Sequence, residues 1–332
     1  MDIEKSSEEN KEKSKDDIPF TKFQILRNVA VISIGFLFIF IPFQSITNLQ
    51  STLNKEEGLG TGGLAIIYGA LVISCMFLPS CVISHLGCKW TIAASMVCYL
   101  LYMAANFHAV WSLIVPASVI IGLGAAPLWS AKCSYLTRMA MWYALLTNST
   151  AHHVMSRFFG FFFMVYQTFS TSYISCTIGI GNVGYVMIGY GIVNAICSVS
   201  FGKLMMYVGQ IPLFAFAFVV HGGTQTGLLL WQPQQEPVYI IYIFAGLWGI
   251  GDAVIQAQVN ALYGFLFKDN LEPAFSNYRL FEAIGFLIAF AWSNFLKTYV
   301  KLYICIGFLT VGMGMYGIVE MLERTNKKKG LD

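Results

Sequence analysis

The middle of this chain is almost free of charge. Of its 332 residues, 37 are Asp, Glu, Lys or Arg, but 13 of these lie in residues 1–27 and seven in residues 320–332, which leaves 17 for the 292 positions between. In a soluble domain, roughly a quarter of the residues are charged. A soluble fold of 292 residues could not cover its surface with only 17 charged residues. The sequence therefore predicts an integral membrane protein, an all-α bundle of transmembrane helices.

Ten segments are long and apolar enough to cross a bilayer, which takes about 20 mostly apolar residues. We expect these spans at residues 29–47, 64–84, 91–109, 111–130, 158–177, 182–202, 211–231, 238–260, 279–296 and 301–320. The expected organisation is a disordered cytoplasmic tail (1–27), an N-terminal half of four spans and an inner loop (28–157), the remaining spans (158–320) and a second cytoplasmic tail (321–332).

The positions of Lys and Arg predict the orientation, because cytoplasmic loops of membrane proteins carry an excess of both. With the N-terminus inside and ten spans, 17 of the 20 Lys and Arg residues fall on the cytoplasmic side and three on the outer side. We therefore expect both termini in the cytoplasm and the protein in the plasma membrane. The Lys-rich ends are expected to meet the anionic lipid of the inner leaflet.

Residues 131–157 are expected to form the longest inner loop. Within it, "MAMWYALL" is too short to span and fits a helix that lies flat on the inner face. Lys132 is expected on the cytoplasmic side, and Trp129 beside it is expected to anchor the fourth span at the interface.

The chain contains a weak internal repeat, as transporter folds often do. "GLGAAPLWSAK" in the fourth span is similar to "GLWGIGDAVIQAQ" in the eighth, with Ala126 of the first copy matched to Asp252 of the second. Two further stretches, "HLGCKW" and "FGKLMM", each combine a glycine with a lysine. They predict short inner turns at Gly87 and Lys89 and at Gly202 and Lys203.

Asp252 is a carboxylate in the middle of a span, where a charge costs a few kcal/mol or more. Gln256 and Asn260 follow it at helical spacing, so the three predict a polar stripe that faces the bundle interior. One interpretation is a surface that faces a solute or an ion, and the other is a hydrogen-bond network that holds helices together. His221 and Gln225 share a face of the seventh span, as a proton relay or as satisfied polar groups.

Arg279 and Glu282 lie three residues apart near the inner end of the ninth span. This spacing allows an ion pair along the helix, with Arg279 extending its side chain towards the interface. A structural clamp is the expected role.

The long motifs of the chain resemble those of the unc-93 family. The resemblance runs from about residue 27 to residue 322, and its most specific stretches are "NLQSTLNKEEGLGTGGLAIIYGA", "GLGAAPLWSAKCSYLT", "VGYVMI", "GLWGIGDAVIQAQVNALYG" and "NYRLFEAIGFLIAF". The turn with Gly87 and Lys89 also resembles the loop between the second and third spans of major facilitator transporters, with only part of that loop's sequence pattern retained. The resemblance implies a facilitator-like bundle of around twelve spans.

This chain has ten predicted spans and no long polar connection between halves. "MSRFFGFFFMVYQ" resembles the start of the family's fifth span, and "STSYISCTIGIGNVGYVMI" resembles the end of its seventh running into its eighth. The fifth span therefore resembles a fusion that omits two helices, and we expect it to pack less well than the others.

Three functions are compatible with these features. The resemblance implies a regulatory or accessory membrane protein that modulates a potassium channel or the trafficking of a membrane protein. Asp252 and its stripe favour instead a secondary transporter of a small solute by alternating access. The omitted helices favour a short form that is nonfunctional or interferes with a longer relative. Two stretches, "GIGNVG" (179–184) and "GMGMYG" (312–317), match the G-x-G-x-x-G dinucleotide pattern, but neither follows a strand, so we discount both. The sequence carries no other enzymatic, cofactor, metal or nucleic-acid-binding motif, so we expect no enzyme and no cofactor.

Overall fold

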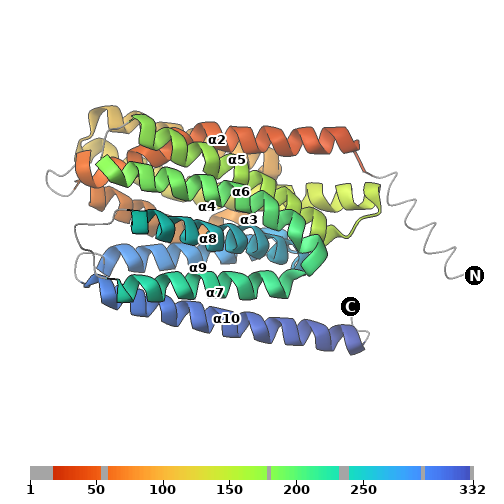
Figure 1. Cartoon of the computed structure of the whole chain (residues 1–332). Coiled ribbons are helices and arrows are strands. Elements are labelled where there is room, and N and C mark those ends of the chain that lie inside the picture. The colour runs from red at the N-terminus through yellow and green to blue at the C-terminus, as the bar shows by residue number, and fades with distance from the viewer. Residues whose placement is uncertain (1–17, 54–58, 178–180, 232–238, 293–295, 330–332) are drawn as a thin grey trace, which may run out of the picture.

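The computed structural model describes residues 18–53, 59–177, 181–231, 239–292 and 296–329, and the regular elements in these ranges are all helical. The helices pack side by side as a bundle (Figure 1). Their bounds are α2 (Lys22–Leu53), α3 (Leu59–Ala105), the short 3-10 helix η2 (Asn106–His108), α4 (Trp111–Thr147), α5 (Ala151–Thr177), α6 (Gly181–Val208), α7 (Gln210–Leu230), α8 (Tyr239–Leu266), α9 (Leu271–Trp292) and α10 (Thr298–Lys329).

The predicted all-α transmembrane bundle is confirmed. Each predicted span corresponds to a helix, and α3 holds two spans because it breaks at Gly87, whose φ of 71° and ψ of 161° are not helical. Seven helices within the described ranges are long and apolar enough to cross a membrane, with the whole of α3 counted once and α5 and α9 not among them. The helices alternate in direction, so α2 begins and α10 ends at the same end of the bundle (Figure 1). We call this the inner end, because the sequence predicts that it faces the cytoplasm.

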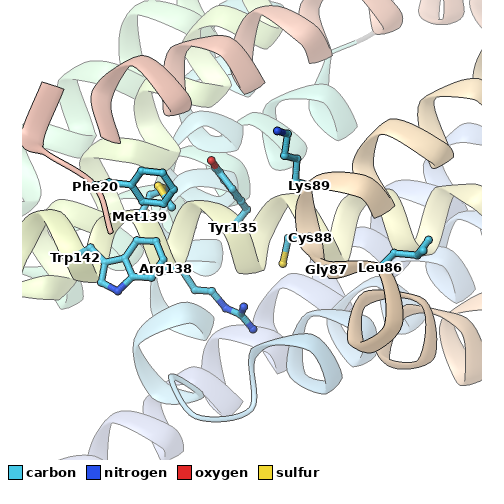
Figure 2. A pocket seen from close by; sticks show the side chains of 9 residues that line it. All are labelled: Phe20, Leu86, Gly87, Cys88, Lys89, Tyr135, Arg138, Met139 and Trp142. Atoms are coloured by element: carbon cyan, nitrogen blue, oxygen red, sulfur yellow. The ribbon is translucent and has the colours of Figure 1, made fainter. Parts of the chain in front are cut away.

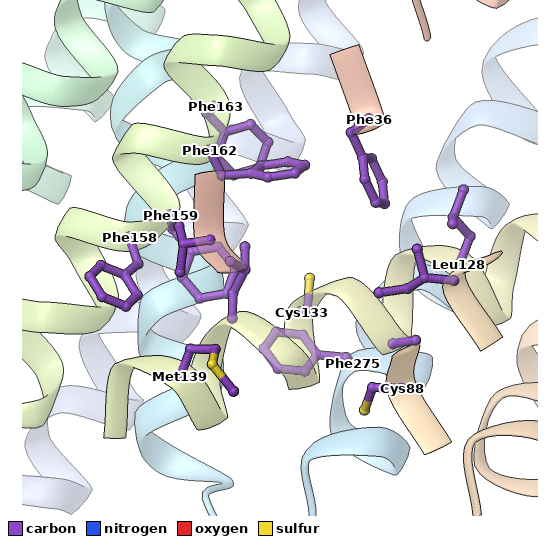
Figure 3. Packing of buried hydrophobic residues seen from close by; sticks show 14 of the residues in the cluster. Phe36, Cys88, Leu128, Cys133, Met139, Phe158, Phe159, Phe162, Phe163 and Phe275 are labelled. Atoms are coloured by element: carbon purple, nitrogen blue, oxygen red, sulfur yellow. The ribbon is translucent and has the colours of Figure 1, made fainter. Parts of the chain in front are cut away.

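Aromatic side chains fill the core of the bundle's first part. Phe36 of α2, Phe159 and Phe162 of α5 and Phe275 of α9 are fully buried and converge around α4 (Figure 3). Phe36 lies edge-on to Phe162, with 5.2 Å between the ring centroids. The first half of α5 is therefore well packed. The second half of α5, where the two family segments are expected to join, has side chains outside the described residues.

The expected inner loop at 131–157 is wrong over most of its length. Helix α4 continues without interruption to Thr147, and α5 begins again at Ala151. The turn between them is short because Asn148 adopts the left-handed conformation (φ 50°) that commonly ends a helix. Lys132, expected in that loop, is consequently a residue of α4, and it is fully buried.

The second predicted inner turn is also wrong. Gly202 and Lys203 lie inside α6, and the chain turns instead at Gly209, whose φ is 79°. Gly202 has a packing role, because a Cβ there would lie 3.0 Å from the carbonyl oxygen of Ser156 on α5. Gly87 and Gly209 are thus the equivalent turns, each with a positive φ that glycine adopts without strain.

Glycines in α4 and α8 make the same kind of close contact with an earlier helix, α3 and α6 respectively. A Cβ on Gly122 would lie 2.5 Å from the carbonyl oxygen of Ile67 on α3, and a Cβ on Gly249 would lie 2.8 Å from that of Tyr190 on α6. Both contacts require glycine, since real Cβ atoms do not approach backbone oxygen so closely. The two copies of the repeat therefore pack against their neighbouring helices through equivalent glycines.

A second pair of contacts fixes the register of this repeat. A Cβ on Gly124 would meet Cys98 of α3 at 2.8 Å, and a Cβ on Gly251 would meet His221 of α7 at 2.6 Å. Both pairs of glycines are 127 residues apart. The structure thus matches "GLGAA" with "GIGDA", so that the counterpart of Asp252 is Ala125 and not Ala126, one residue away from the sequence-based alignment.

Helices α4 and α8 also contact each other at equivalent positions. The Cys133 thiol donates a hydrogen bond to Asn260 Oδ1 (3.1 Å), and these residues are 127 positions apart. One turn further along each helix, Thr137 packs on Gly264, again its equivalent. A residue that touches its own equivalent lies close to a two-fold axis. The crossing of α4 and α8 therefore marks the pseudo-two-fold axis of the bundle.

The Gly264–Thr137 contact yields the first prediction. Gly264→Ala should destabilise the protein by about 1–3 kcal/mol, because the new Cβ would lie 2.5 Å from Thr137 Oγ1 and 3.0 Å from its Cγ2. Adding Thr137→Ala should restore most of the loss, since it removes both atoms. Thermal unfolding in detergent measures the effect, with Gly285→Ala, which meets nothing within 4 Å, as the matched control. A double variant no more stable than Gly264→Ala would contradict this account.

Candidate functional site

Asp252 of α8 is held by two side chains of α6. Tyr190 donates its hydroxyl hydrogen to Asp252 Oδ2 at 2.7 Å, and Asn194 donates from Nδ2 to the same oxygen at 2.8 Å. Asn194 in turn accepts a hydrogen bond from Ser198 (3.3 Å) on the next turn of α6. The carboxylate is thus part of a polar network between two helices, as a costly charge inside a membrane requires.

The predicted stripe on α8 divides between two neighbours. Asp252 meets α6, whereas Asn260 is buried against Cys133 of α4 and donates from Nδ2 to the backbone oxygen of Gln256 (2.7 Å). The side chain of Gln256 is only half-buried. The three residues therefore do not converge on one point, although Asp252 and Asn260 both lie inside the bundle.

Gln258, which the sequence analysis did not single out, is a further fully buried polar residue of this helix. Its side-chain amide and the hydroxyl of Ser156 on α5 hydrogen-bond at 2.8–3.0 Å. Gln258 lies on a different face of α8 from Asp252. The polar side chains of α8 therefore form hydrogen bonds with three helices, α4, α5 and α6.

His221 and Gln225 of α7 are both buried, as expected for residues on one face. The His221 ring packs edge-on against Trp248 with 5.3 Å between centroids. Among the described residues, neither His221 Nδ1 nor Gln225 Oε1 has a hydrogen-bond partner.

Arg279 forms the predicted ion pair with Glu282, but it does not reach the interface. Arg279 is only 7% exposed, and its Nη1 donates a hydrogen bond to Glu282 Oε2. Its Cζ lies 4.7 Å from the centroid of the Trp129 ring and 4.8 Å from that of Tyr278. The pair therefore sits inside the bundle, among aromatic rings that attract a cation.

Lys132 is the second buried cation of this region, and it was expected in a cytoplasmic loop. Its Nζ is enclosed by rings of Trp129 (5.0 Å to the centroid), Phe159 (5.5 Å), Phe162 (4.4 Å) and Phe163 (5.0 Å). Trp129 contacts both Lys132 and Arg279, so it joins two cations inside the bundle instead of anchoring a span at the interface. We refer to Lys132, Arg279, Glu282 and Trp129 as the cation cluster.

The predicted turn at Gly87 borders a cavity of about 210 Å³ at the inner end (Figure 2). Lys89 and Arg138 supply its charges, and Arg138 also forms an ion pair with Glu272 at the start of α9. The remaining lining is mostly apolar and consists of Phe20, Leu86, Cys88, Tyr135, Met139 and Trp142. No group of three His, Cys, Asp or Glu that could hold a metal occurs in the described ranges.

The Asp252 network gives the second prediction. Tyr190→Phe should lower stability by about 1 kcal/mol, because it removes one of two donors to a buried carboxylate oxygen. Thermal unfolding of the purified protein measures the loss, and Tyr239→Phe on the exposed end of α8 is the matched control. An equal melting temperature for the two variants would show that the Tyr190 hydrogen bond does not stabilise the fold.

Comparison with known proteins identifies the family. The family profile described as "Ion channel regulatory protein UNC-93" matches residues 50–205 and again 182–316. "Protein unc-93 homolog A" of Xenopus laevis is 32% identical, over 92% of this chain and 95% of the relative, and the human protein of that name is also 32% identical, over 91% and 94%. "Putative potassium channel regulatory protein unc-93" of Caenorhabditis elegans is 25% identical, over 90% of this chain and 61% of the relative.

The alignment with the Xenopus protein spans 436 positions, which exceeds the 332 residues of this chain. Part of the relative therefore has no counterpart here, although both ends of the alignment lie near the ends of the two proteins. The expected family is confirmed: the chain belongs to the UNC-93 family.

Proposed function

We propose that this protein is a non-enzymatic regulatory or accessory subunit that modulates a potassium channel or the trafficking of another membrane protein. The observation that supports this most directly is its membership of a family described as ion channel regulators. The Caenorhabditis elegans relative carries potassium channel regulation in its name. The partner class is therefore an integral membrane protein in the same bilayer.

The interior of the bundle supports a regulatory role. Asp252 Oδ2 already accepts two hydrogen bonds from the chain's own side chains. Aromatic side chains fill the space between α2, α4, α5 and α9. Asp252, the residue that motivates the transporter alternative, therefore has Oδ2 occupied by the chain's own donors, whereas a transport path needs polar groups that remain open to a solute.

The outer surface of the bundle offers an area for a partner helix. Helix α10 packs mainly on α7, and it exposes large apolar side chains along its length. Phe308, Val311 and Met315 are each more than 60% exposed. Exposed apolar surface inside a bilayer meets either lipid or another transmembrane helix, and van der Waals packing drives such helix association.

We propose the plasma membrane as the location, with both termini in the cytoplasm. The start of α2 and the end of α10 at one end of the bundle support termini on one side of the membrane (Figure 1). With Lys132 and Arg279 now inside the bundle, the remaining cations still favour that end strongly over the other.

The alternative is a secondary transporter of a small solute. A buried carboxylate and an internal repeat, here Asp252 and the α4–α8 repeat, are common features of such transporters. A third possibility is a short form that interferes with a longer relative, and the alignment that is longer than this chain favours it.

A co-expression experiment separates these functions. Expressed with a potassium channel in oocytes, the protein should change the channel current under voltage clamp and should co-purify with the channel. Proteoliposomes that contain the purified protein should show no solute uptake driven by an ion gradient. Uptake that Asp252→Asn abolishes, without any effect on channels, would favour the transporter. Retention in the endoplasmic reticulum, relieved when two helices are restored at 165–175, would favour the interfering form.

Epitope tags test the proposed topology. Tags placed before Lys22 and after Lys329 should both be inaccessible to antibody in intact cells and accessible after permeabilisation. A tag inserted at 232–237, between α7 and α8 and outside the cell in the proposed topology, should be accessible in intact cells and serves as the control. Labelling of only one terminal tag in intact cells would mean that the number of membrane crossings is odd.

A further inference from the structure

The cation cluster contains more positive charge than its neighbours neutralise. Lys132 and Arg279 are both at least nine-tenths buried, and they come from different helices, α4 and α9. Glu282 is the carboxylate of the cluster, and in the described structure it forms an ion pair with Arg279. A buried charge without a counter-charge is costly unless something else compensates it.

Arg279 presents an unused pair of donors. Its Nη1 binds Glu282, whereas Nε and Nη2 have no hydrogen-bond partner in the described part of the chain and are shielded from solvent. Nε–H and Nη2–H form one edge of the planar guanidinium and point in parallel. This edge matches the two oxygens of a carboxylate, which accept such bonds in bidentate fashion.

Lys132 is a second cation in contact with the Trp129 ring that Arg279 also contacts. Its ammonium has three donors, and none has a partner among the described residues. The rings around it compensate part of the charge but accept no conventional hydrogen bond. Because Lys132 and Arg279 both lie on the ring of Trp129, the unused donors of the two residues occur in one small region.

The cluster lies too deep for these side chains to reach water at the inner end. Arg138 of α4 and Glu272 of α9 form an ion pair closer to that end. Lys132 and Arg279 lie six and seven residues deeper along the two antiparallel helices, or about 9–10 Å at the rise of an α-helix. The two cations are thus at the same depth, one on each side of the α4–α9 contact.

From this geometry we propose that the cation cluster is a binding site for an organic carboxylate. The carboxylate oxygens accept hydrogen bonds from Arg279 Nε and Nη2 and from Lys132 Nζ, and its negative charge balances the extra cation. The apolar body of the ligand packs on the aromatic rings that surround Lys132. This proposal is independent of any effect on a channel.

The carboxylate has two possible sources with the same chemistry. A small aromatic acid would enter from water, and an acyl acid would enter from the lipid. Benzoate and octanoate represent the two sources, while benzamide and octanamide have nearly the same shape without the charge.

The test is thermal unfolding of the purified full-length chain in detergent, titrated with each compound at constant ionic strength. A ligand that binds only the folded state raises the melting temperature in a saturating manner. We expect benzoate or octanoate, or both, to do so, and neither amide nor added chloride to match them. A shift with benzoate alone identifies a water-soluble ligand, and a shift with octanoate alone identifies one from the lipid.

Two variants test whether the cation cluster is the site. Lys132→Met removes the ammonium, and Arg279→Lys keeps a charge for Glu282 but removes the bidentate edge. Each should weaken carboxylate binding about tenfold or more, through the loss of charge-assisted hydrogen bonds. Lys203→Met, on the exposed side of α6, should leave the affinity unchanged.

Three results would overturn the proposal. The first is no saturating shift of the wild-type protein with either carboxylate. The second is an equal shift with the amides or with chloride. The third is an unchanged affinity in Lys132→Met and Arg279→Lys. If one variant does not fold, the other variant and the comparison of acid with amide on the wild-type protein still decide the outcome.

Discussion

The contact between α4 and α8 lies where the two repeats of this bundle meet, and it marks the axis that relates them. Thr137 can lie directly on α8 only because Gly264 has no side chain. One turn away, Cys133 and Asn260 meet by a hydrogen bond. Each pair joins equivalent positions, so the two helices cross near a pseudo-two-fold axis. Every other equivalence, including the glycine contacts with α3, α6 and α7, follows from this axis.

Equivalent positions in the two repeats nevertheless carry different charges. Asp252 corresponds to Ala125, and Lys132 corresponds to Val259. At each of these two positions, one repeat carries a charge inside the bundle where the other repeat is apolar. The carboxylate has its donors on α6, whereas the ammonium has aromatic rings and no hydrogen-bond partner in the described residues. The chain itself therefore supplies hydrogen-bond donors to the carboxylate, whereas the ammonium obtains hydrogen-bond acceptors only when an anion binds.

The sequence predicted the features that depend on composition and missed those that depend on neighbouring helices. Lack of charge and apolar length identify a membrane bundle, and the cost of a charge in lipid predicts that Asp252 faces inwards. Lys132 was misassigned because a lysine near a span's end usually reaches water, and only the rings of α5 reveal that this one does not. Gly202 was misassigned because glycine favours turns and close helix contacts alike. The repeat was one residue out of register because helical periodicity does not distinguish Ala125 from Ala126.

The same axis also relates the other contacts that join the two repeats. The carbonyl oxygen of Cys75 on α3 accepts a hydrogen bond from Ser276 of α9, and that of Ser198 on α6 lies against Gly160 of α5. Cys75 and Ser198 are 123 residues apart, the same spacing as Ile67 and Tyr190. The α3–α9 and α5–α6 contacts are thus equivalent, and each joins one repeat to the other. Helices α2 and α10 have no equivalent in these contacts. The contacts that join the two repeats therefore do not require an equivalent of α2 or of α10.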